Sequence, residues 1–269
     1  MKHTFHKGEF DIWRCARCGS MFVHNVPGAA ALSEIYAAHT YYELPDESVE
    51  RIRQENQRRL RSLPGPAARR TILDVGCAQG LLLDGAQAMG FQTYGTELSA
   101  ANVSICVQHG HKVIKGYVQD ITDVPEGGFD VIACLDVIEH VDDPLEFLSR
   151  LIRLLSDSGI LVVSTPNYSG IVAKLLGRRD PYMIPPEHLN FFTRQGMIFM
   201  FRKCSLKIEK RVTFGRLTSQ ERQRAILKFF PAWLKPLSAI INSLLPIIFH
   251  GLNFARLGLE QEFYLSRRG

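Results

Sequence analysis

Hydrophobic positions along the middle of the chain follow two different repeat lengths in turn. Short apolar runs predict five strands, at residues 71–75, 91–96, 112–118, 129–135 and 160–164. Amphipathic stretches between them predict helices at residues 80–89, 99–109 and 144–155. Strands and helices that alternate at this spacing form βαβ units around a parallel sheet. Because runs such as VIACL and ILVVS are almost wholly apolar, we expect helices to cover both faces of this sheet.

The two ends of the chain differ from this alternating region. Residues 1–45 show no regular pattern, and residues 46–63 predict a strongly charged helix. Pro64-Gly65-Pro66 then interrupts the chain, so we expect an N-terminal appendage over residues 1–65 and a second unit over residues 66–269. Towards the C-terminus the pattern predicts two more strands, at 206–212 and 262–266, with a helical insert at 219–257 between them.

The composition is that of an ordinary globular protein. Hydrophobic residues make up 46% of the chain and charged residues 22%, which excludes a wholly disordered chain. The net charge of +5 is modest and no nucleic-acid-binding motif accompanies it, so we expect no nucleic-acid partner. Because the first ten residues are polar and unlike a signal peptide, we interpret the six cysteines as reduced thiols of a cytoplasmic protein.

A glycine-containing turn joins the first strand of the alternating region to its first helix. In the run ILDVGCAQG, residues 72–80, Gly76 and Gly80 allow a sharp turn and a close approach of the backbone to a ligand. The N–H groups at the start of the following helix then face that ligand. Glu97 ends the next strand, where a carboxylate accepts hydrogen bonds from both ribose hydroxyls of a nucleoside.

The spacing of small residues in the turn and the charge beside it distinguish a nicotinamide dinucleotide from S-adenosylmethionine as the ligand. A nicotinamide dinucleotide is held by G-x-G-x-x-G, whereas this turn reads Gly76-x-Ala78-x-Gly80 and has no third glycine in place. Asp74 at the end of the strand favours a cationic ligand and opposes a pyrophosphate. The ammonium and sulfonium groups of S-adenosylmethionine fit this charge, so an NAD-dependent oxidoreductase is disfavoured.

The run LDVGCAQG resembles motif I of class I S-adenosylmethionine-dependent methyltransferases, which usually have glycine where Ala78 stands. The segment EHLNFFT, residues 187–193, is typical of a branch similar to ubiquinone-biosynthesis O-methyltransferases and bacterial glycan or lipid methyltransferases. The resemblance covers roughly residues 70–210 and the closing strand. It implies a Rossmann-like, mostly parallel sheet with helices on both faces, an antiparallel last strand, and a helical insert before that strand.

The resemblance also implies which residues bind the cofactor. Tyr117 stands where this branch often has aspartate, so we assign the adenine contacts to the two residues after Val118. The predicted binding residues are Asp74, Gly76, Ala78, Gly80, Glu97, Gln119, Asp120 and Leu135. For Asp74 a helix cap, for Glu97 a surface carboxylate and for Leu135 a plain core position are the alternatives.

Two histidines follow predicted strands at the edge where open α/β sheets form their active sites. We expect His140 or His188 to accept the proton of the methyl acceptor, because an imidazole titrates near neutral pH. A structural contact in the core is the alternative for each.

Two metal sites are alternatives that we do not favour. Asp136, Glu139 and His140 match positions at which ubiquinone-type enzymes are thought to hold magnesium. Cys15 and Cys18 form half of a zinc site, which a pair of histidines, His3 and His6, would complete. We predict no bound metal, and interpret the cysteine pair as the remnant of a zinc knuckle.

The insert at 219–257 has the composition of a membrane contact. Residues 236–255 carry no formal charge and are long enough to span a bilayer, but the strand at 262–266 has to return to the sheet. Basic and aromatic residues just upstream suit lipid headgroups, so we expect peripheral binding to the inner face of the membrane. A lid or a dimer interface is the alternative.

These patterns predict an enzyme that methylates oxygen in a small or lipid-linked acceptor of the quinone-precursor or glycan type. N-methylation of an amino sugar is the second reading, and a cofactor-binding scaffold without chemistry of its own is the third.

Overall fold

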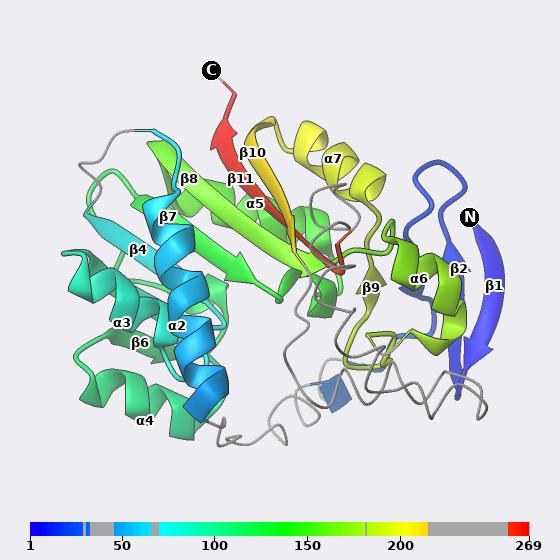
Figure 1. The fold of residues 1–269 in the computed structure, drawn as a ribbon, viewed down its shortest axis with the longest axis horizontal. Coiled ribbons are helices and arrows are strands. Elements are labelled where there is room, and N and C mark those ends of the chain that lie inside the picture. The colour runs from blue at the N-terminus through cyan, green and yellow to red at the C-terminus, as the bar shows by residue number, and fades with distance from the viewer. Residues whose placement is uncertain (29–30, 33–45, 66–69, 181, 215–257, 269) are drawn as a thin grey trace, which may run out of the picture.

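The computed structural model describes residues 1–28, 31–32, 46–65, 70–180, 182–214 and 258–268 (Figure 1). The N-terminal part contains strands β1 (Lys2–Lys7), β2 (Phe10–Arg14) and β3 (Met21–Val23), then helix α2 (Asp46–Arg61). The elements that follow are β4 (Thr71–Val75), α3 (Leu81–Ala88), β5 (Gln92–Glu97), α4 (Ala100–Gln108), β6 (Lys112–Lys115), η1 (Val118–Asp120), β7 (Phe129–Leu135), η2 (Ile138–His140), α5 (Pro144–Leu154), β8 (Leu155–Pro166), α6 (Ile171–Leu176), η3 (Gly177–Arg179), β9 (Asn190–Phe191), α7 (Arg194–Lys203), β10 (Leu206–Phe214) and β11 (Glu260–Arg267).

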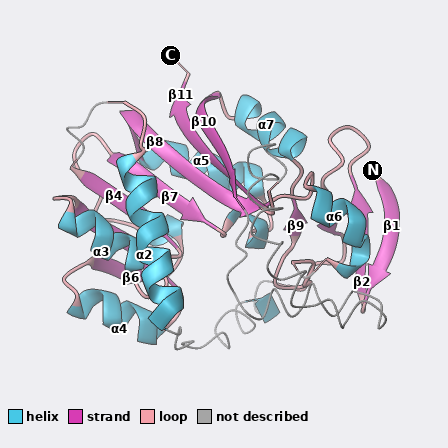
Figure 2. Ribbon diagram, viewed as in Figure 1, coloured by secondary structure: helices cyan, strands magenta, loops and turns pink. Residues whose placement is uncertain are grey.

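A seven-stranded sheet forms the centre of the molecule (Figure 2). Its strand order is β10-β11-β8-β7-β4-β5-β6, and β4 to β8 pair in parallel. Strand β11 is antiparallel to both β8 and β10. The predicted Rossmann-like sheet with an antiparallel last strand is confirmed.

Helices cover both faces of this sheet because successive side chains of a strand point to opposite sides. In β4, Ile72 packs with apolar side chains of α2, α3 and α4. The next residue, Leu73, packs with apolar side chains of α5 and α7 on the other face. The continuous apolar runs in the sequence therefore correspond to strands that are buried on both sides.

The boundaries of the helices follow from local capping. The Ser99 hydroxyl accepts a hydrogen bond from Asn102 N–H at the start of α4, and the Asp143 carboxylate accepts from Leu145 and Glu146 N–H at the start of α5. Gly90 and Gly110 follow α3 and α4 with φ of 87° each. Ser99 and Asp143 thus end loops that follow parallel strands, whereas Gly90 and Gly110 lie in loops that lead back to the next strand.

Four predicted strands have different lengths in the structure, since β10 and β11 extend beyond the predicted ranges 206–212 and 262–266, and β6 and β8 also differ. Strand β6 ends at Lys115 rather than Val118, because the chain turns at Gly116 and Val118 begins the helix η1. Strand β8 begins at Leu155 instead of Ile160, because its first residue already pairs with Phe129 of β7.

The N-terminal residues form a second sheet, which the sequence pattern does not predict. Strands β1, β2 and β3 pair antiparallel, and the two-residue strand β9 completes the sheet by pairing with β3. Ile12, Met21 and Phe191 are buried in its apolar core. The expectation of an irregular start is therefore wrong for residues 1–28, and a strand pair joins this part to the rest of the chain.

The predicted insert at 219–257 lies outside the described residues, since the structure describes the chain only up to 214 and again from 258. Within the described residues, no helix combines the length and the apolar character needed to cross a membrane.

Candidate active site

The loop between β4 and α3 has a backbone that requires small residues. Gly76, Ala78 and Gly80 have φ of 72°, 47° and 78°. A Cβ atom on Gly76 would lie 2.8 Å from Val137, and one on Gly80 would lie 2.9 Å from Cys106. The N–H groups of residues 76 and 77 donate to the carbonyl of Thr96 at 2.9 and 3.0 Å, which ties the loop to β5.

Glu97 lies beside this loop and is held by backbone donors. One carboxylate oxygen accepts from Ala78 N–H at 2.9 Å, and the other accepts from Leu98 and Ser99 N–H at 2.8 Å each. Three hydrogen bonds fix the orientation of a half-buried carboxylate at the end of β5. A carboxylate held in this way is ready to accept ribose hydroxyls, which is the role that the sequence predicts for it.

Asp74 is a buried carboxyl at the end of β4. It is 5% exposed. Burial raises the pKa of its carboxyl to about 7, although the Arg59 guanidinium acts in the opposite direction, and the charge of Glu97 adds to the rise. A cationic group beside Asp74 would favour the ionised carboxylate. The electrostatics of this position therefore agree with a ligand that carries an ammonium group.

The other predicted cofactor residues lie at the ends of neighbouring strands. Gln119 and Asp120 are exposed in η1, and Asp120 accepts a hydrogen bond from Tyr117 N–H at 2.7 Å within its own turn. Leu135 is half-buried at the end of β7. These three assignments stay predictions.

A cavity of about 250 Å³ lies at the ends of β7, β8 and β11. Its polar side chains belong to Asp136 and Glu139 after β7, to Tyr182 and His188 in the segment after η3, and to Glu260 at the start of β11. The complete lining is Asp136, Glu139, Pro166, Tyr182, Ile184, His188 and Glu260. Neutral and charged oxygens thus surround one buried imidazole.

The two predicted histidines lie together. The ring of His140 meets that of His188 edge-on, with 4.7 Å between the centroids. His140 Nδ1 donates to the carbonyl of Glu187 at 2.6 Å, which leaves the lone pair of the neutral ring on Nε2. His188 is 7% exposed and lines the cavity, whereas His140 is not among the residues that line it. The structure thus brings together two residues that the sequence offers as alternatives.

Glu139, like Asp74, is a buried carboxyl with a raised pKa. It is 1% exposed, and burial raises the pKa of its carboxyl well above the usual value, with the charge of Asp136 adding to the effect. Glu260, which sequence reasoning missed, lies at the same cavity because β11 pairs it with Pro166 of β8. No short-range pattern points to Glu260, since its place depends on how the last strand enters the sheet.

The magnesium alternative is not supported by the groups that meet here. Glu139, His140 and His188 offer ligand atoms within 4.8 Å of one another. Asp136 instead accepts a hydrogen bond from the Ser164 hydroxyl at 3.0 Å. Two imidazoles and one carboxylate are not the all-oxygen set that magnesium prefers.

The alternative of a zinc site at the N-terminus is also not supported. His3 and His6 of β1 lie beside Asp11 rather than beside the cysteines, and His6 Nδ1 is 2.6 Å from Asp11 Oδ1. Cys15 and Cys18 lie in the turn after β2. Within the described part of the chain, no cluster of three metal-binding side chains includes either cysteine.

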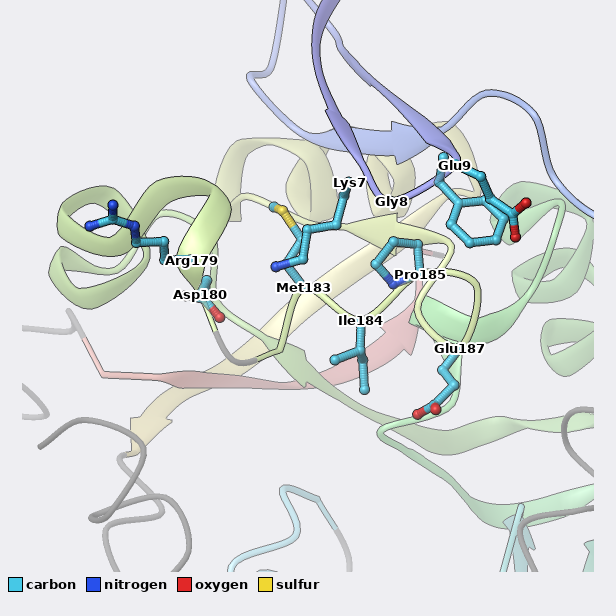
Figure 3. A pocket seen from close by; sticks show the side chains of 10 residues that line it. Lys7, Gly8, Glu9, Arg179, Asp180, Met183, Ile184, Pro185 and Glu187 are labelled. Carbon is cyan, nitrogen blue, oxygen red and sulfur yellow. The ribbon is translucent and has the colours of Figure 1, made fainter. Parts of the chain in front are cut away.

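A larger groove of about 690 Å³ lies between the β1–β2 hairpin and the segment after η3 (Figure 3). Lys7 and Phe10 line it from the hairpin, and Arg179 and Met183 line it from the other side. Lys7 Nζ donates to the carbonyl of Arg178 at 2.7 Å and so holds the hairpin in place. Ile184 lines both the groove and the smaller cavity.

Comparison with known sequences places the loop between β4 and α3 inside a family match. The sequence profile of the family described as "Methyltransferase domain" matches residues 38–210. The ubiquinone biosynthesis O-methyltransferase of Bradyrhizobium sp. (strain ORS 278) is 36% identical over 100 residues, which is 36% of this chain and 40% of that protein. The enzyme of the same name from Thiobacillus denitrificans is 28% identical over 151 residues, 53% of this chain and 65% of that protein. The matches thus span less than two thirds of these relatives.

Solved structures share the fold at low sequence identity. A methyltransferase from Thermotoga maritima, described as a possible histamine N-methyltransferase, covers 82% of this chain and aligns over 91% of its own length, with a TM-score of 0.55 and 15% identity. The plantazolicin methyltransferase, solved with S-adenosylhomocysteine, covers 89% of this chain and 90% of its own, with a TM-score of 0.52 and 17% identity. With the family profile matching over half of the sequence, the chain belongs to the methyltransferase-domain family.

Proposed function

We propose that this enzyme methylates a hydroxyl oxygen of a small or lipid-linked acceptor, with His188 as the base. The observation that carries the proposal is the position of His188, a buried imidazole in the wall of a cavity at the carboxyl ends of β7 and β8. Open α/β sheets bind their ligands at this edge. The predicted cofactor residues Asp74 and Glu97 end the neighbouring strands β4 and β5.

The chemistry is an in-line displacement at the methyl carbon. The acceptor oxygen forms a bond to the methyl group while the bond from that carbon to the sulfonium breaks, which leaves S-adenosylhomocysteine. The hydroxyl proton passes to His188, and His140 holds the ring of His188 through their edge contact of 4.7 Å. Most of the acceleration comes from holding the acceptor in line with the methyl group.

The oxygen acceptor is supported by the printed names of the curated relatives, which are O-methyltransferases. The groove beside the β1–β2 hairpin extends the acceptor site, because Ile184 lines the groove and the cavity alike. In this proposal the reacting hydroxyl enters the cavity and the remainder of the acceptor lies in the groove. Its mixed lining of Lys7, Arg179, Phe10 and Met183 suits an acceptor with polar and apolar parts.

A peripheral membrane contact through residues 219–257 completes the proposal for a lipid-linked acceptor. These residues lie outside the described part of the chain, so the support comes from their apolar and basic composition alone. Sedimentation with anionic liposomes tests the contact. Deletion of 219–257 is expected to abolish co-sedimentation, and equal co-sedimentation of the deletion variant would contradict it.

The test of the catalytic proposal compares two histidine variants. With membrane extracts as the acceptor source and methyl-labelled cofactor, His188→Ala is expected to lower turnover by about 10²–10⁴-fold. Binding of S-adenosylhomocysteine should remain within twofold of the original. His24→Ala is the matched control, because His24 stacks on Trp13 in the N-terminal sheet, with 4.5 Å between the ring centroids. Normal turnover in His188→Ala would exclude the base assignment.

A nitrogen acceptor is the second candidate, and one observation favours it. Asp136, Glu139 and Glu260 place three carboxyl groups around the cavity, which suits a protonated amine of an amino sugar. Analysis of the labelled product separates the two candidates. A methyl ether supports the oxygen acceptor, whereas an N-methyl product that resists ether cleavage would replace it.

A further inference from the structure

Three side chains of types that bind metals meet near the loop between β4 and α3, outside the cavity described above. Asp84 comes from α3, His109 follows α4, and His111 precedes β6. His111 Nε2 and His109 Nδ1 each lie 3.1 Å from the same oxygen, Asp84 Oδ1. Two imidazoles and one carboxylate from three segments of the chain thus meet at one place.

We propose that Asp84, His109 and His111 bind a divalent transition-metal ion of the zinc class. Around a tetrahedral zinc ion with bonds of about 2.0 Å, neighbouring ligand atoms are about 3.3 Å apart. The two separations of 3.1 Å are already close to this value, and the three ligand atoms lie within 4.8 Å of one another. Two neutral imidazoles and a carboxylate are a common ligand set for zinc, with water in the fourth position.

The surroundings of His111 hold it in the orientation that a metal ligand needs. Its side chain is fully buried, and Nδ1 lies 2.9 Å from the Thr93 hydroxyl of β5. When Nδ1–H donates to this hydroxyl, the lone pair lies on Nε2, the nitrogen that faces Asp84. The ring is also packed against Gly80, where a Cβ atom would lie 3.3 Å from it. The contacts of His111 with Thr93 and Gly80 therefore hold the ring in place without an ion.

The opposite side of the cluster is open to solvent. The side chain of His109 is 46% exposed and that of Asp84 is 26% exposed, so an ion and its water reach the site without unfolding. The same contacts also suit a metal-free arrangement in which both imidazoles donate to the carboxylate. Measuring whether the protein retains zinc distinguishes the zinc-bound arrangement from this metal-free one.

The ion would stabilise the cofactor loop rather than take part in methyl transfer. Asp84 lies one turn after Gly80, and its N–H donates to the carbonyl of Gly80 at 2.8 Å. Binding therefore joins the start of α3 to the connection between α4 and β6. None of the three ligands lines the cavity at His188.

The test uses the full chain after treatment with a chelator and dialysis. Calorimetric titration with zinc chloride and metal analysis after desalting should show one ion more in the wild type than in His109→Ala. Zinc should raise the melting temperature of the wild type more than that of this variant. His109 is largely exposed, so the variant is expected to fold, and its binding of S-adenosylhomocysteine verifies this.

Two matched variants complete the design. His3→Ala/His6→Ala removes the other histidine pair, which lies beside Asp11, and should keep the zinc ion assigned to Asp84. Thr93→Val should weaken zinc binding about 10- to 100-fold, because it removes the acceptor that orients His111. Equal zinc content and affinity in the wild type and His109→Ala, or no zinc in the wild type, would overturn the proposal.

Discussion

Ala78 combines a useful contact with an unfavourable backbone. Its N–H donates to Glu97, but its φ of 47° lies in the left-handed region, which costs a residue with a Cβ atom about 1–2 kcal/mol. The related family usually has glycine at this position, so the chain keeps the geometry of the loop at the expense of some stability. The contact with Glu97 is made by the backbone of residue 78 and not by its side chain.

Replacement of Ala78 by glycine should therefore stabilise the protein. We expect Ala78→Gly to raise the free energy of unfolding by about 0.5–1 kcal/mol, since relief of strain exceeds the added entropy of the unfolded chain. Ala101→Gly in α4 is the matched control and should lower it by up to about 1 kcal/mol. Urea unfolding measures both. A loss of stability in Ala78→Gly would show that the loop is not strained.

The buried carboxyl of Asp74 predicts a pH dependence of cofactor binding. Its pKa is raised to about 7, so the folded protein holds a proton that the unfolded chain releases, and stability from this group falls as the pH rises through 7. The ammonium group of the cofactor favours the ionised carboxylate. The affinity for S-adenosylhomocysteine should therefore rise about tenfold from pH 6 to pH 8. Calorimetry in two buffers should show proton release at pH 6.

Asp74→Asn isolates this effect from other titrating groups. The variant should bind more weakly and lose the change in affinity between pH 6 and pH 8. An unchanged pH dependence in Asp74→Asn would assign it to another group.

At the scale of elements, a buried ion pair attaches α2 to the sheet. Arg59 Nε lies 2.7 Å from the Glu262 carboxylate of β11, and Tyr264 donates to the other oxygen of that carboxylate at 2.7 Å. Both charged side chains are at most 7% exposed. Arg59 also acts on Asp74, whose pKa it lowers. Helix α2, which precedes the alternating region, thus influences the charge of Asp74.

Removal of one partner should be costly because it leaves the other charge buried. Arg59→Met is expected to lower the free energy of unfolding by about 3–5 kcal/mol. Arg59→Met/Glu262→Gln should recover part of this loss, since the glutamine amide still accepts from Tyr264. Denaturant unfolding of the two single variants and the double variant gives the coupling. Strictly additive losses would contradict a direct pair.

The elements predicted from sequence are those whose pattern is set by burial alone. Strand β7, for example, has the predicted bounds because both of its faces are packed. The two-residue strand β9 was missed because it exists only by pairing with Met21 and Phe22. His188 is a candidate in the sequence because it follows a predicted strand, whereas the position of Glu260 depends on the pairing of β11 with β8. Contacts between distant segments thus account for what the pattern left out.

At the scale of the whole molecule, strand order concentrates the chemistry at one edge. The loop of β4, Glu97 of β5, the η2 turn after β7 and Glu260 of β11 belong to four strands of one sheet, and β9 joins the N-terminal sheet to the same segment that carries His188. In the proposed function, the sheet provides the cofactor site and the segments around it shape the acceptor site.

The most direct test of this account is calorimetric titration of the purified protein with S-adenosylhomocysteine, with NAD as the control. We predict saturable binding of S-adenosylhomocysteine alone, and its loss in Asp74→Ala and in Glu97→Ala. Binding of NAD instead, or unchanged binding in both variants, would contradict the assignment of the loop between β4 and α3 as the cofactor site.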